Sequence, residues 1–201
     1  MKNILMTILV FLFATPLMAQ SNNEVASNMT IIRLTILKDN NKILMRNTEN
    51  GWMTPAIYYT KRQNIKEALD SLANVYGIKI SEPTLGGLFT YKYEFKSTSD
   101  MRQFYVSNYQ KGDLKSPNDI EQVEWMPIEE AISKLSNTVS SLGEQTRQVL
   151  NFPSTLWGGS FILNRVNGKL VSKVENEFYP LREDLTSDAL KNKTSAIKKK
   201  R

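Results

Sequence analysis

The side chains that could do chemistry in this chain are carboxylates, lysines, arginines, tyrosines and hydroxyls. The sequence of 201 residues contains no cysteine and no histidine. It therefore lacks thiolate nucleophiles, serine–histidine pairs, disulfides and the usual ligands of zinc sites. What remains is acid–base work by carboxylates, a hard cation such as Mg²⁺ held by oxygen ligands, and recognition of phosphate by arginine.

Four carboxylates are candidates for such a site. Glu67 and Asp70 are three residues apart in a segment with helical periodicity, which places them on one helix face. Glu121 lies within a predicted strand, and Glu124 lies at the end of the same strand. Three of them have a plainer interpretation that we favour, Glu67 as a helix N-cap partner and Glu121 and Glu124 as solvated surface charges.

Aromatic residues alternate along the predicted strand 84–95. Tyr91 and Tyr93 are candidates for contacting a ligand, because a tyrosine ring can stack on a base and its hydroxyl can satisfy a polar edge. The alternative is packing in the core or on a sheet face, which is the commoner role of alternating aromatics on a strand.

The element that must position Glu67 and Asp70 is a helix predicted over residues 64–77. Asn64 is a good N-cap, and Glu67 three residues later completes a capping box. Gly77 is placed to end the helix. One apolar stripe follows the helical period, formed by Ile65, Ala68, Leu69, Leu72, Ala73 and Tyr76.

The surrounding pattern alternates between strands and helices. Asn167-Gly168 between two apolar runs is a strong hairpin signal, and Pro180 is expected to end its second strand. The predicted strands are 31–37, 43–46, 78–80, 84–95, 103–109 and 120–125, and the further helices are 127–135 and 138–150.

This order of elements resembles the Nudix superfamily, and the likeness is sharpest between Gly51 and Ile78. The family's box reads G-x5-E-x7-R-E-U-x-E-E-x-G-U, where U is aliphatic, and it aligns without a gap when its initial glycine falls on Ala56. Trp52 and Pro55 also stand where family members carry these residues. The resemblance implies an α/β fold, the Nudix-type α/β/α sandwich with a mixed sheet, over residues 29–150, followed by a C-terminal β-hairpin over 151–181.

The box keeps the positions that a fold needs and lacks those that the family's reaction needs. Gly77 and Ile78 keep its end, whereas the three positions at which family members hold Mg²⁺ with carboxylates are Ser71, Asn74 and Val75. Because all three ligand charges are missing, we expect no catalytic residue in the box and no cofactor. The alternative is a metal-dependent hydrolase of nucleoside diphosphate derivatives that uses Mg²⁺ and displaced carboxylates.

The resemblance also suggests roles for four charged residues. The box's first glutamate falls on Arg62 and its arginine on Asp70, so we predict a structural ion pair with reversed signs; the alternative is two unrelated surface charges. Arg33 and Arg46 lie on the first hairpin, where family members contact phosphate, and are candidates for binding a ligand.

The two ends of the chain have the composition of processed or solvated segments. Residues 1–19 have a positive start, an apolar run and a small residue before the cleavage point, as in a signal peptide. Residues 20–28 are predicted to be a flexible lead-in, and 182–201 a disordered basic tail. The net charge of +6 is concentrated in that tail without interleaved aromatics, so we expect no nucleic acid partner.

Together these features predict an exported protein, secreted or periplasmic, with no stable membrane span after signal cleavage. Its expected role is to bind a small ligand or another envelope protein through a Nudix-like domain without catalytic activity.

Overall fold

The structure is a computed structural model that describes residues 29–59, 62–117 and 122–183. The predicted signal peptide, the lead-in, nearly all of the basic tail and Glu121 lie outside these ranges. No helix within them is both long and apolar enough to cross a membrane.

The described residues form one mixed sheet and three helices. The strands are β1 (Met29–Lys38), β2 (Lys42–Thr48), β3 (Gly51–Met53), β4 (Ala56–Tyr58), β5 (Ile78–Ile80), β6 (Thr84–Tyr93), β7 (Lys96–Gly112), β8 (Gln122–Pro127), β9 (Thr155–Val166) and β10 (Lys169–Glu183). The helices are α1 (Ile65–Val75), α2 (Ile128–Thr138) and α3 (Ser140–Asn151).

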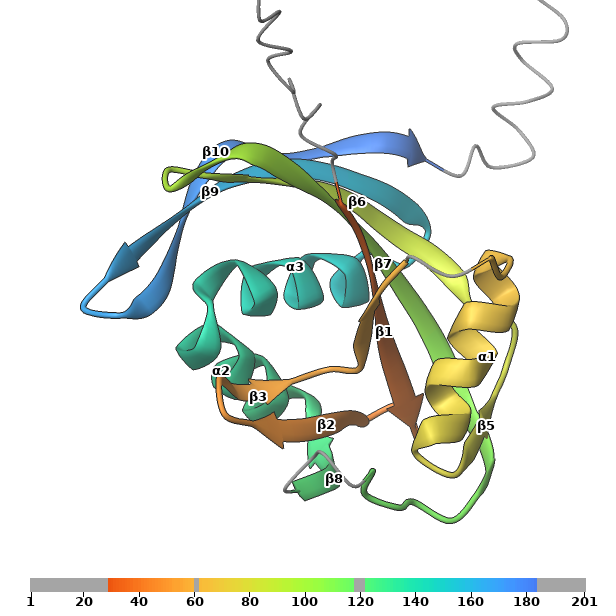
Figure 1. Ribbon diagram of the computed structural model, residues 1–201. Helices are drawn as coiled ribbons and strands as arrows, with labels where there is room; N and C mark the ends of the chain where they lie inside the picture. The colour runs from red at the N-terminus through yellow and green to blue at the C-terminus, as the bar shows by residue number, and fades with distance from the viewer. Residues whose placement is uncertain (1–28, 60–61, 118–121, 184–201) are drawn as a thin grey trace, which may run out of the picture.

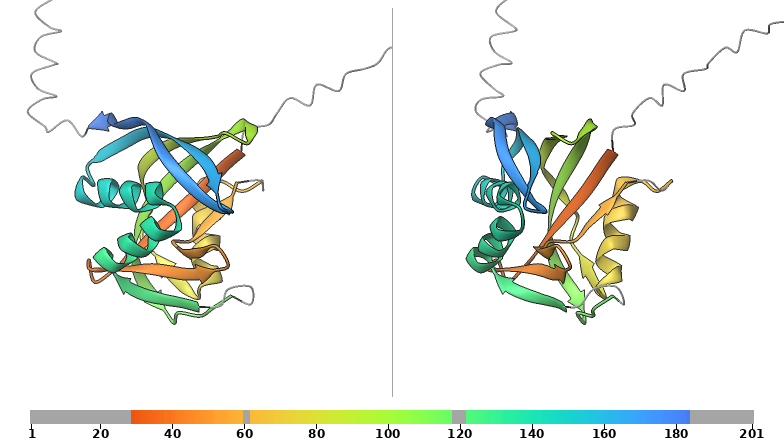
Figure 2. Two further views of the ribbon diagram at one scale, coloured as in Figure 1. Left: turned by 90° about the vertical axis from the view of Figure 1, so that its left-hand side faces the viewer. Right: turned by 60° about the vertical axis from the view of Figure 1, so that its left-hand side comes forward.

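The main strand order is β10-β9-β6-β7-β1-β2-β3, with β4 paired to β1, β5 to β7 and β8 to β2. β1 and β7 are parallel, as are β6 and β9, and the remaining pairs are antiparallel. α1 covers one side of the sheet, and α2 and α3 cover the other (Figures 1 and 2). This is the predicted α/β/α sandwich with a mixed sheet.

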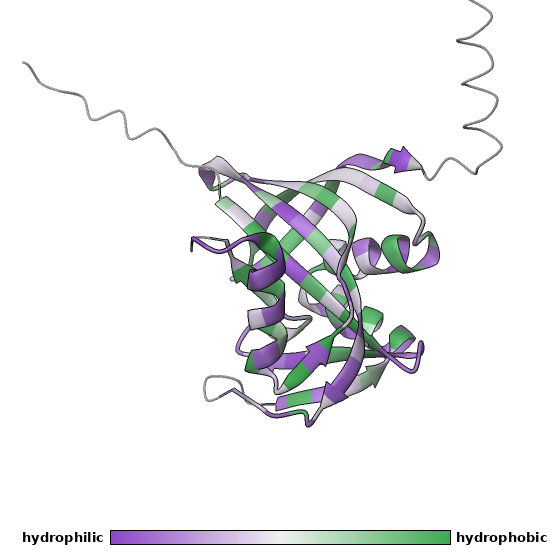
Figure 3. Cartoon of the chain, turned by 90° about the vertical axis from the view of Figure 1, so that its right-hand side faces the viewer, coloured by the Kyte–Doolittle hydropathy of each residue, from purple (hydrophilic) through white to green (hydrophobic). Residues whose placement is uncertain are grey.

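Alternation along the strands divides the core between the two sides. Ile32, Leu34 and Ile36 of β1 are fully buried and pack with Leu69 and Leu72 of α1. Figure 3 shows the same alternation of hydrophobic and hydrophilic residues along the long strands beside α1. The residues between them in β1 therefore face α2 and α3.

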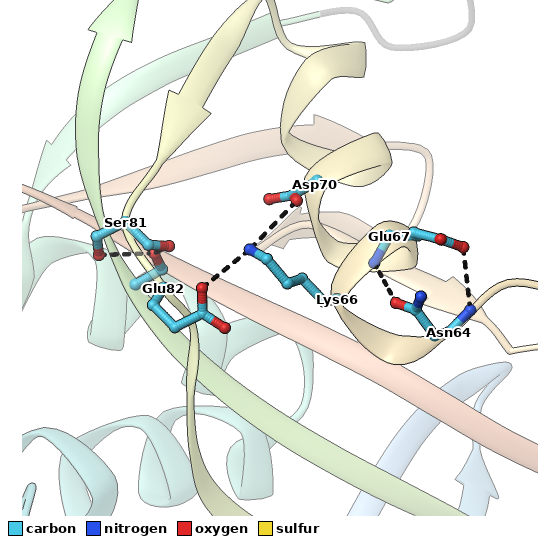
Figure 4. A network of polar contacts seen from close by, with 7 residues as sticks. Asn64, Lys66, Glu67, Asp70, Ser81 and Glu82 are labelled. Atoms are coloured by element: carbon cyan, nitrogen blue, oxygen red, sulfur yellow. Dashed lines mark hydrogen bonds and ion pairs between the residues drawn. The ribbon is translucent and has the colours of Figure 1, made fainter.

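The local signals at α1 are confirmed. Asn64 accepts a hydrogen bond from the backbone N–H of Glu67, and the Glu67 carboxylate accepts one from the N–H of Asn64, which completes the capping box (Figure 4). Gly77 follows the helix with φ of 77°, a left-handed conformation that favours glycine. This end of the box therefore has a structural role.

The C-terminal hairpin forms at Asn167-Gly168, where both residues have positive φ. It also extends the main sheet, because β9 runs parallel to β6 from Gly87 to Tyr93. The prediction that Pro180 ends β10 was wrong. The strand continues to Glu183, because β10 is an edge strand and a proline there breaks no second ladder.

Candidate functional site

An opening in the sheet lies where the partner of β1 changes. β1 pairs with β2 only at Leu37 and Lys38, and it pairs with β4 at its other end, from Ile31 to Arg33. β2 meanwhile continues alongside β3 and β8, where Arg46 lies opposite Met53. The divergence of β2 from β4 leaves room between Arg33 and Arg46.

A third arginine reaches the same opening from β7. Arg102 is the register partner of Ile31 in the parallel β1–β7 pair. Because Ile31 lies two residues before Arg33, Arg102 and Arg33 are on the same face of the sheet. Phe104, opposite Arg33, packs in the core cluster on the side away from α1. Arg33 and Arg102 therefore both face α2 and α3.

Arg33 is held in place and almost fully buried. Its exposed fraction is 5%, and its Nη1 donates to the backbone oxygen of Thr54 at 3.2 Å and to Thr54 Oγ1 at 2.9 Å. Burial, followed by the nearby charge of Arg102 and then that of Arg46, lowers the pKa of Arg33 to about 9. A guanidinium nevertheless stays protonated at neutral pH, so the protein buries a cation at this position.

Arg102 is fixed by two tyrosines. Its guanidinium lies 3.6 Å from the ring centroid of Tyr91, and its Nη2 donates to the hydroxyl of Tyr93 at 3.3 Å. Tyr91 is itself buried, with its hydroxyl bonded to Ser141 and Gln145. Tyr91, a candidate for contacting a ligand, packs in the core, as in the alternative interpretation, and supports Arg102 from beneath. Tyr93 stays a candidate.

None of the three arginines makes an ion pair with another described residue. The buried carboxylate of Asp100 accepts from Tyr93 and pairs with Lys96 at 3.1 Å, so its charge is already offset. The Nε atoms of Arg33, Arg46 and Arg102 are buried and have no hydrogen-bond partner in the described part of the chain. Buried donors without partners are rare in folded proteins and call for a ligand or water.

These arginines line a cavity of about 250 Å³, which we call the arginine pocket. Besides the three guanidiniums, the wall contains the side-chain amide of Asn50, and no described acidic residue lines it. A concave site with several converging cations is suited to an oxyanion, because the guanidinium fork matches phosphate and carboxylate oxygens.

Tyr93 gives this cluster a pH dependence. Burial, and then the hydrogen bond to Asp100, raises the pKa of Tyr93 to about 12. Since the folded pKa lies above the ordinary value of 10.0, the protonated hydroxyl contributes stability that is complete below pH 10. That contribution is lost as the pH rises from 10 towards 12.

Replacing Tyr93 by phenylalanine is therefore expected to flatten the alkaline limb of the stability profile. The effect is at most about 1–2 kcal/mol, because the side chain is only partly buried and its interactions are screened by solvent. Urea unfolding followed between about pH 9 and 11.5 measures it. Wild-type and Tyr93→Phe curves of equal slope would contradict the assignment.

The family's metal-binding positions lie elsewhere. Ser71, Asn74 and Val75 are exposed on α1, with Val75 at 47% exposure. They belong to the helix on the other side of the sheet from Arg33 and Arg102. Within the described residues no group of three acidic, histidine or cysteine side chains could hold a metal ion.

Asp70 has a different partner from the predicted one. Its carboxylate pairs with Lys66 at 3.5 Å, and Lys66 also pairs with Glu82 at 2.9 Å (Figure 4). Arg62 stands exposed before the helix. The predicted ion pair between Arg62 and Asp70 is thus replaced by one within α1, because an i, i+4 lysine is closer than a residue outside the helix.

The other candidate carboxylates have local roles or stay untested. Glu67 caps α1, and Glu124 accepts a hydrogen bond from Gln122 at 3.2 Å. Glu121 lies outside the described residues.

Sequence reasoning found Arg33 and Arg46 but missed Arg102 and Thr54. The available signal for Arg102 was its place two residues before buried Phe104, on the same face of a strand. An arginine within a buried strand face needs a partner or a ligand.

Comparison with known proteins identifies the fold. No family model matches the sequence, and no curated protein matches it. A MutT protein from Bacillus halodurans superimposes with a TM-score of 0.59 at 15% identity, covering 73% of this chain and 97% of that one.

Two further solved structures match less well. An ADP-ribose pyrophosphatase from Streptococcus suis gives a TM-score of 0.48 at 11% identity, over 62% of this chain and 91% of that one. A UDP-X diphosphatase gives a TM-score of 0.49 at 16% identity, over 63% of this chain and 64% of that one. The MutT superposition carries the conclusion about the fold, and at this identity it extends no further.

Proposed function

We propose that this chain, which has the Nudix fold, is a binding protein that holds a small oxyanion in the arginine pocket and does not hydrolyse it. The observation that supports the proposal most is the set of three guanidiniums around one cavity, each with a buried Nε that lacks a partner. An anion there would offset the charges of Arg102 and Arg46, which add to burial in lowering the pKa of Arg33.

The preferred anion is a phosphate group. Arginine binds phosphate through paired N–H donors, and three guanidiniums are better matched by a dianion than by a single negative charge. Arg33 and Arg102 are held by Thr54, Tyr91 and Tyr93, so little side-chain entropy is lost on binding.

The absence of hydrolysis follows from the box. Ser71 and Asn74 offer neutral oxygens and Val75 offers none, whereas Mg²⁺ prefers charged carboxylates. These positions also lie on α1, away from the face that carries Arg33 and Arg102. The proposal therefore separates a binding pocket on one side of the sheet from an inert helix on the other.

Titration calorimetry with inorganic phosphate and pyrophosphate tests this function. We expect binding that does not need Mg²⁺ and is weakened about tenfold or more in Arg46→Ala, because a hydrogen bond to a charged group contributes about 1.5–3 kcal/mol. Arg147→Ala, which removes an exposed arginine paired with Glu129, is the matched control and should bind normally.

Assaying released phosphate in the same samples separates this proposal from the enzymatic alternative. Turnover of pyrophosphate or of a nucleoside diphosphate derivative with Mg²⁺, abolished by replacing Asp70 or Glu124, would overturn it and favour a hydrolase with displaced carboxylates. Binding without release supports it.

We also propose that the protein is exported to the periplasm or the medium, on the strength of the sequence of residues 1–19. Mature protein whose N-terminus is Gln20 would support this. A cytoplasmic product that retains residues 1–19 would contradict it.

A further inference from the structure

The arginine pocket has a second property that phosphate binding alone does not use. Apart from its arginines and Asn50, its wall is built from apolar and aromatic side chains. Those that the following argument uses are Tyr58, Val139, Leu142, Leu163 and Leu170. An inorganic phosphate would leave the exposed members of this wall, Tyr58 and Leu170, uncovered.

The charged and apolar parts of the wall come from different elements. The arginines lie on β1, β2 and β7, whereas Val139 joins α2 to α3, Leu142 lies on α3, and Leu163 and Leu170 lie on the C-terminal hairpin. Figure 1 shows α3 on the side of the sheet away from α1. Arg33 and Arg102 face the same side. A ligand in the pocket thus meets cations from the sheet and apolar side chains from α3 and the hairpin.

Two of the apolar residues are exposed in the absence of a ligand. Tyr58 is 59% exposed and Leu170 is 37% exposed, although both line the pocket. Large apolar side chains beside a concave site lose water-accessible area when a ligand with a matching surface binds. A hydroxylated ligand would instead lose hydrogen bonds to water at these side chains without gaining partners.

Size limits the ligand further. The cavity of about 250 Å³ is below the range of about 300–1,000 Å³ that holds drug-sized molecules. It has room for a phosphate group and a short chain or small ring.

We propose that the ligand is a soluble phosphate monoester or phosphonate with a short apolar body, whose phosphate lies on the three arginines and whose body lies on Tyr58 and Leu170, the exposed apolar residues of the wall. This inference rests on the proposed function, since it names the class of ligand for the same pocket.

A homologous series of alkyl phosphates tests it. Titration calorimetry with methyl, ethyl, propyl and butyl phosphate is expected to show affinity rising about fourfold per methylene, the fold-change that corresponds to burying one such group. The rise should level off when the cavity is full. Glycerol phosphate, which matches propyl phosphate in its carbon chain but carries hydroxyls, should bind more weakly than propyl phosphate.

Leu170→Asn makes the test specific to the wall. This change is expected to flatten the rise with chain length while leaving the affinity for methyl phosphate within about twofold. Val174→Asn is the matched control, because Val174 is an exposed apolar residue on the same strand that does not line the pocket. It should leave the whole series unchanged.

The outcomes separate this inference from the proposed function. An affinity that does not depend on chain length, or tighter binding of glycerol phosphate than of propyl phosphate, would overturn the inference. The proposed function would still hold if inorganic phosphate bound and Arg46→Ala weakened that binding. Capture by phosphatidate vesicles in place of the soluble esters would also overturn it. Failure of every phosphate to bind would overturn the proposed function itself.

Discussion

Replacing Arg102 by alanine is expected to weaken phosphate binding by about 10- to 100-fold. The change removes charged donors from the pocket, and each hydrogen bond to a charged group contributes about 1.5–3 kcal/mol. Arg102→Lys should fall between wild type and alanine, because lysine keeps the charge but not the planar fork that Tyr91 and Tyr93 hold in place. Titration calorimetry with inorganic phosphate gives both values.

The same variant should hardly change stability when no anion is present. Arg102 contributes to lowering the pKa of Arg33, so removing it relieves a repulsion and offsets the lost contact with Tyr91. We expect the free energy of unfolding to change by less than about 1 kcal/mol. A large loss of stability with unchanged phosphate affinity would show that Arg102 is a structural residue and not part of a binding site.

Replacing Gly77 by alanine is expected to destabilise the protein by about 2–5 kcal/mol. Gly77 has φ of 77°, which costs alanine about 1–2 kcal/mol. A Cβ there would also lie 2.4 Å from the backbone oxygen of Asp113, and relieving such a contact costs about 1–3 kcal/mol. Chemical denaturation measures the change.

Gly168 provides a matched control for this prediction. It has nearly the same backbone conformation, with φ of 79°, but an added Cβ would meet nothing within 4 Å. Gly168→Ala should therefore show only the conformational cost of about 1–2 kcal/mol. Equal losses for Gly77→Ala and Gly168→Ala would mean that the contact with Asp113 does not matter.

The local elements were predictable because their signals are short-range. Asn64 and Glu67 form the capping box, Gly77 ends the helix, and Asn167-Gly168 makes the hairpin turn. Each depends on backbone groups within a few residues, which the sequence shows directly. The gap-free spacing of the box then allowed the Nudix-type fold to be predicted from these elements, and the structural superposition confirms that fold.

The site was only half predictable because it depends on contacts between distant strands. Arg33 and Arg46 come from neighbouring strands, but Arg102 reaches them through the parallel pairing of β1 with β7, about 70 residues apart, for which no local pattern codes. The partner of Asp70 was mistaken for a similar reason. Arg62 and Lys66 are both near Asp70 in the sequence, and in the folded chain Lys66 is the residue that pairs with it.

The proposed function rests on two features of this chain, the arginine pocket and the altered box. The helix that would hold the metal keeps its packing against β1 through Leu69 and Leu72. The opposite face of β1 carries Arg33, a cation without a protein counter-charge among the described residues. The proposed ligand site and the altered box therefore lie on opposite faces of the same strand.

A crystal structure of the protein soaked in selenate tests the central claim most directly, because selenium scatters anomalously and locates a phosphate-like anion without ambiguity. We predict one anomalous peak in the arginine pocket, within hydrogen-bond distance of the Nε or Nη atoms of Arg33, Arg46 and Arg102. Selenate bound elsewhere on the surface while this pocket holds only water would contradict the account.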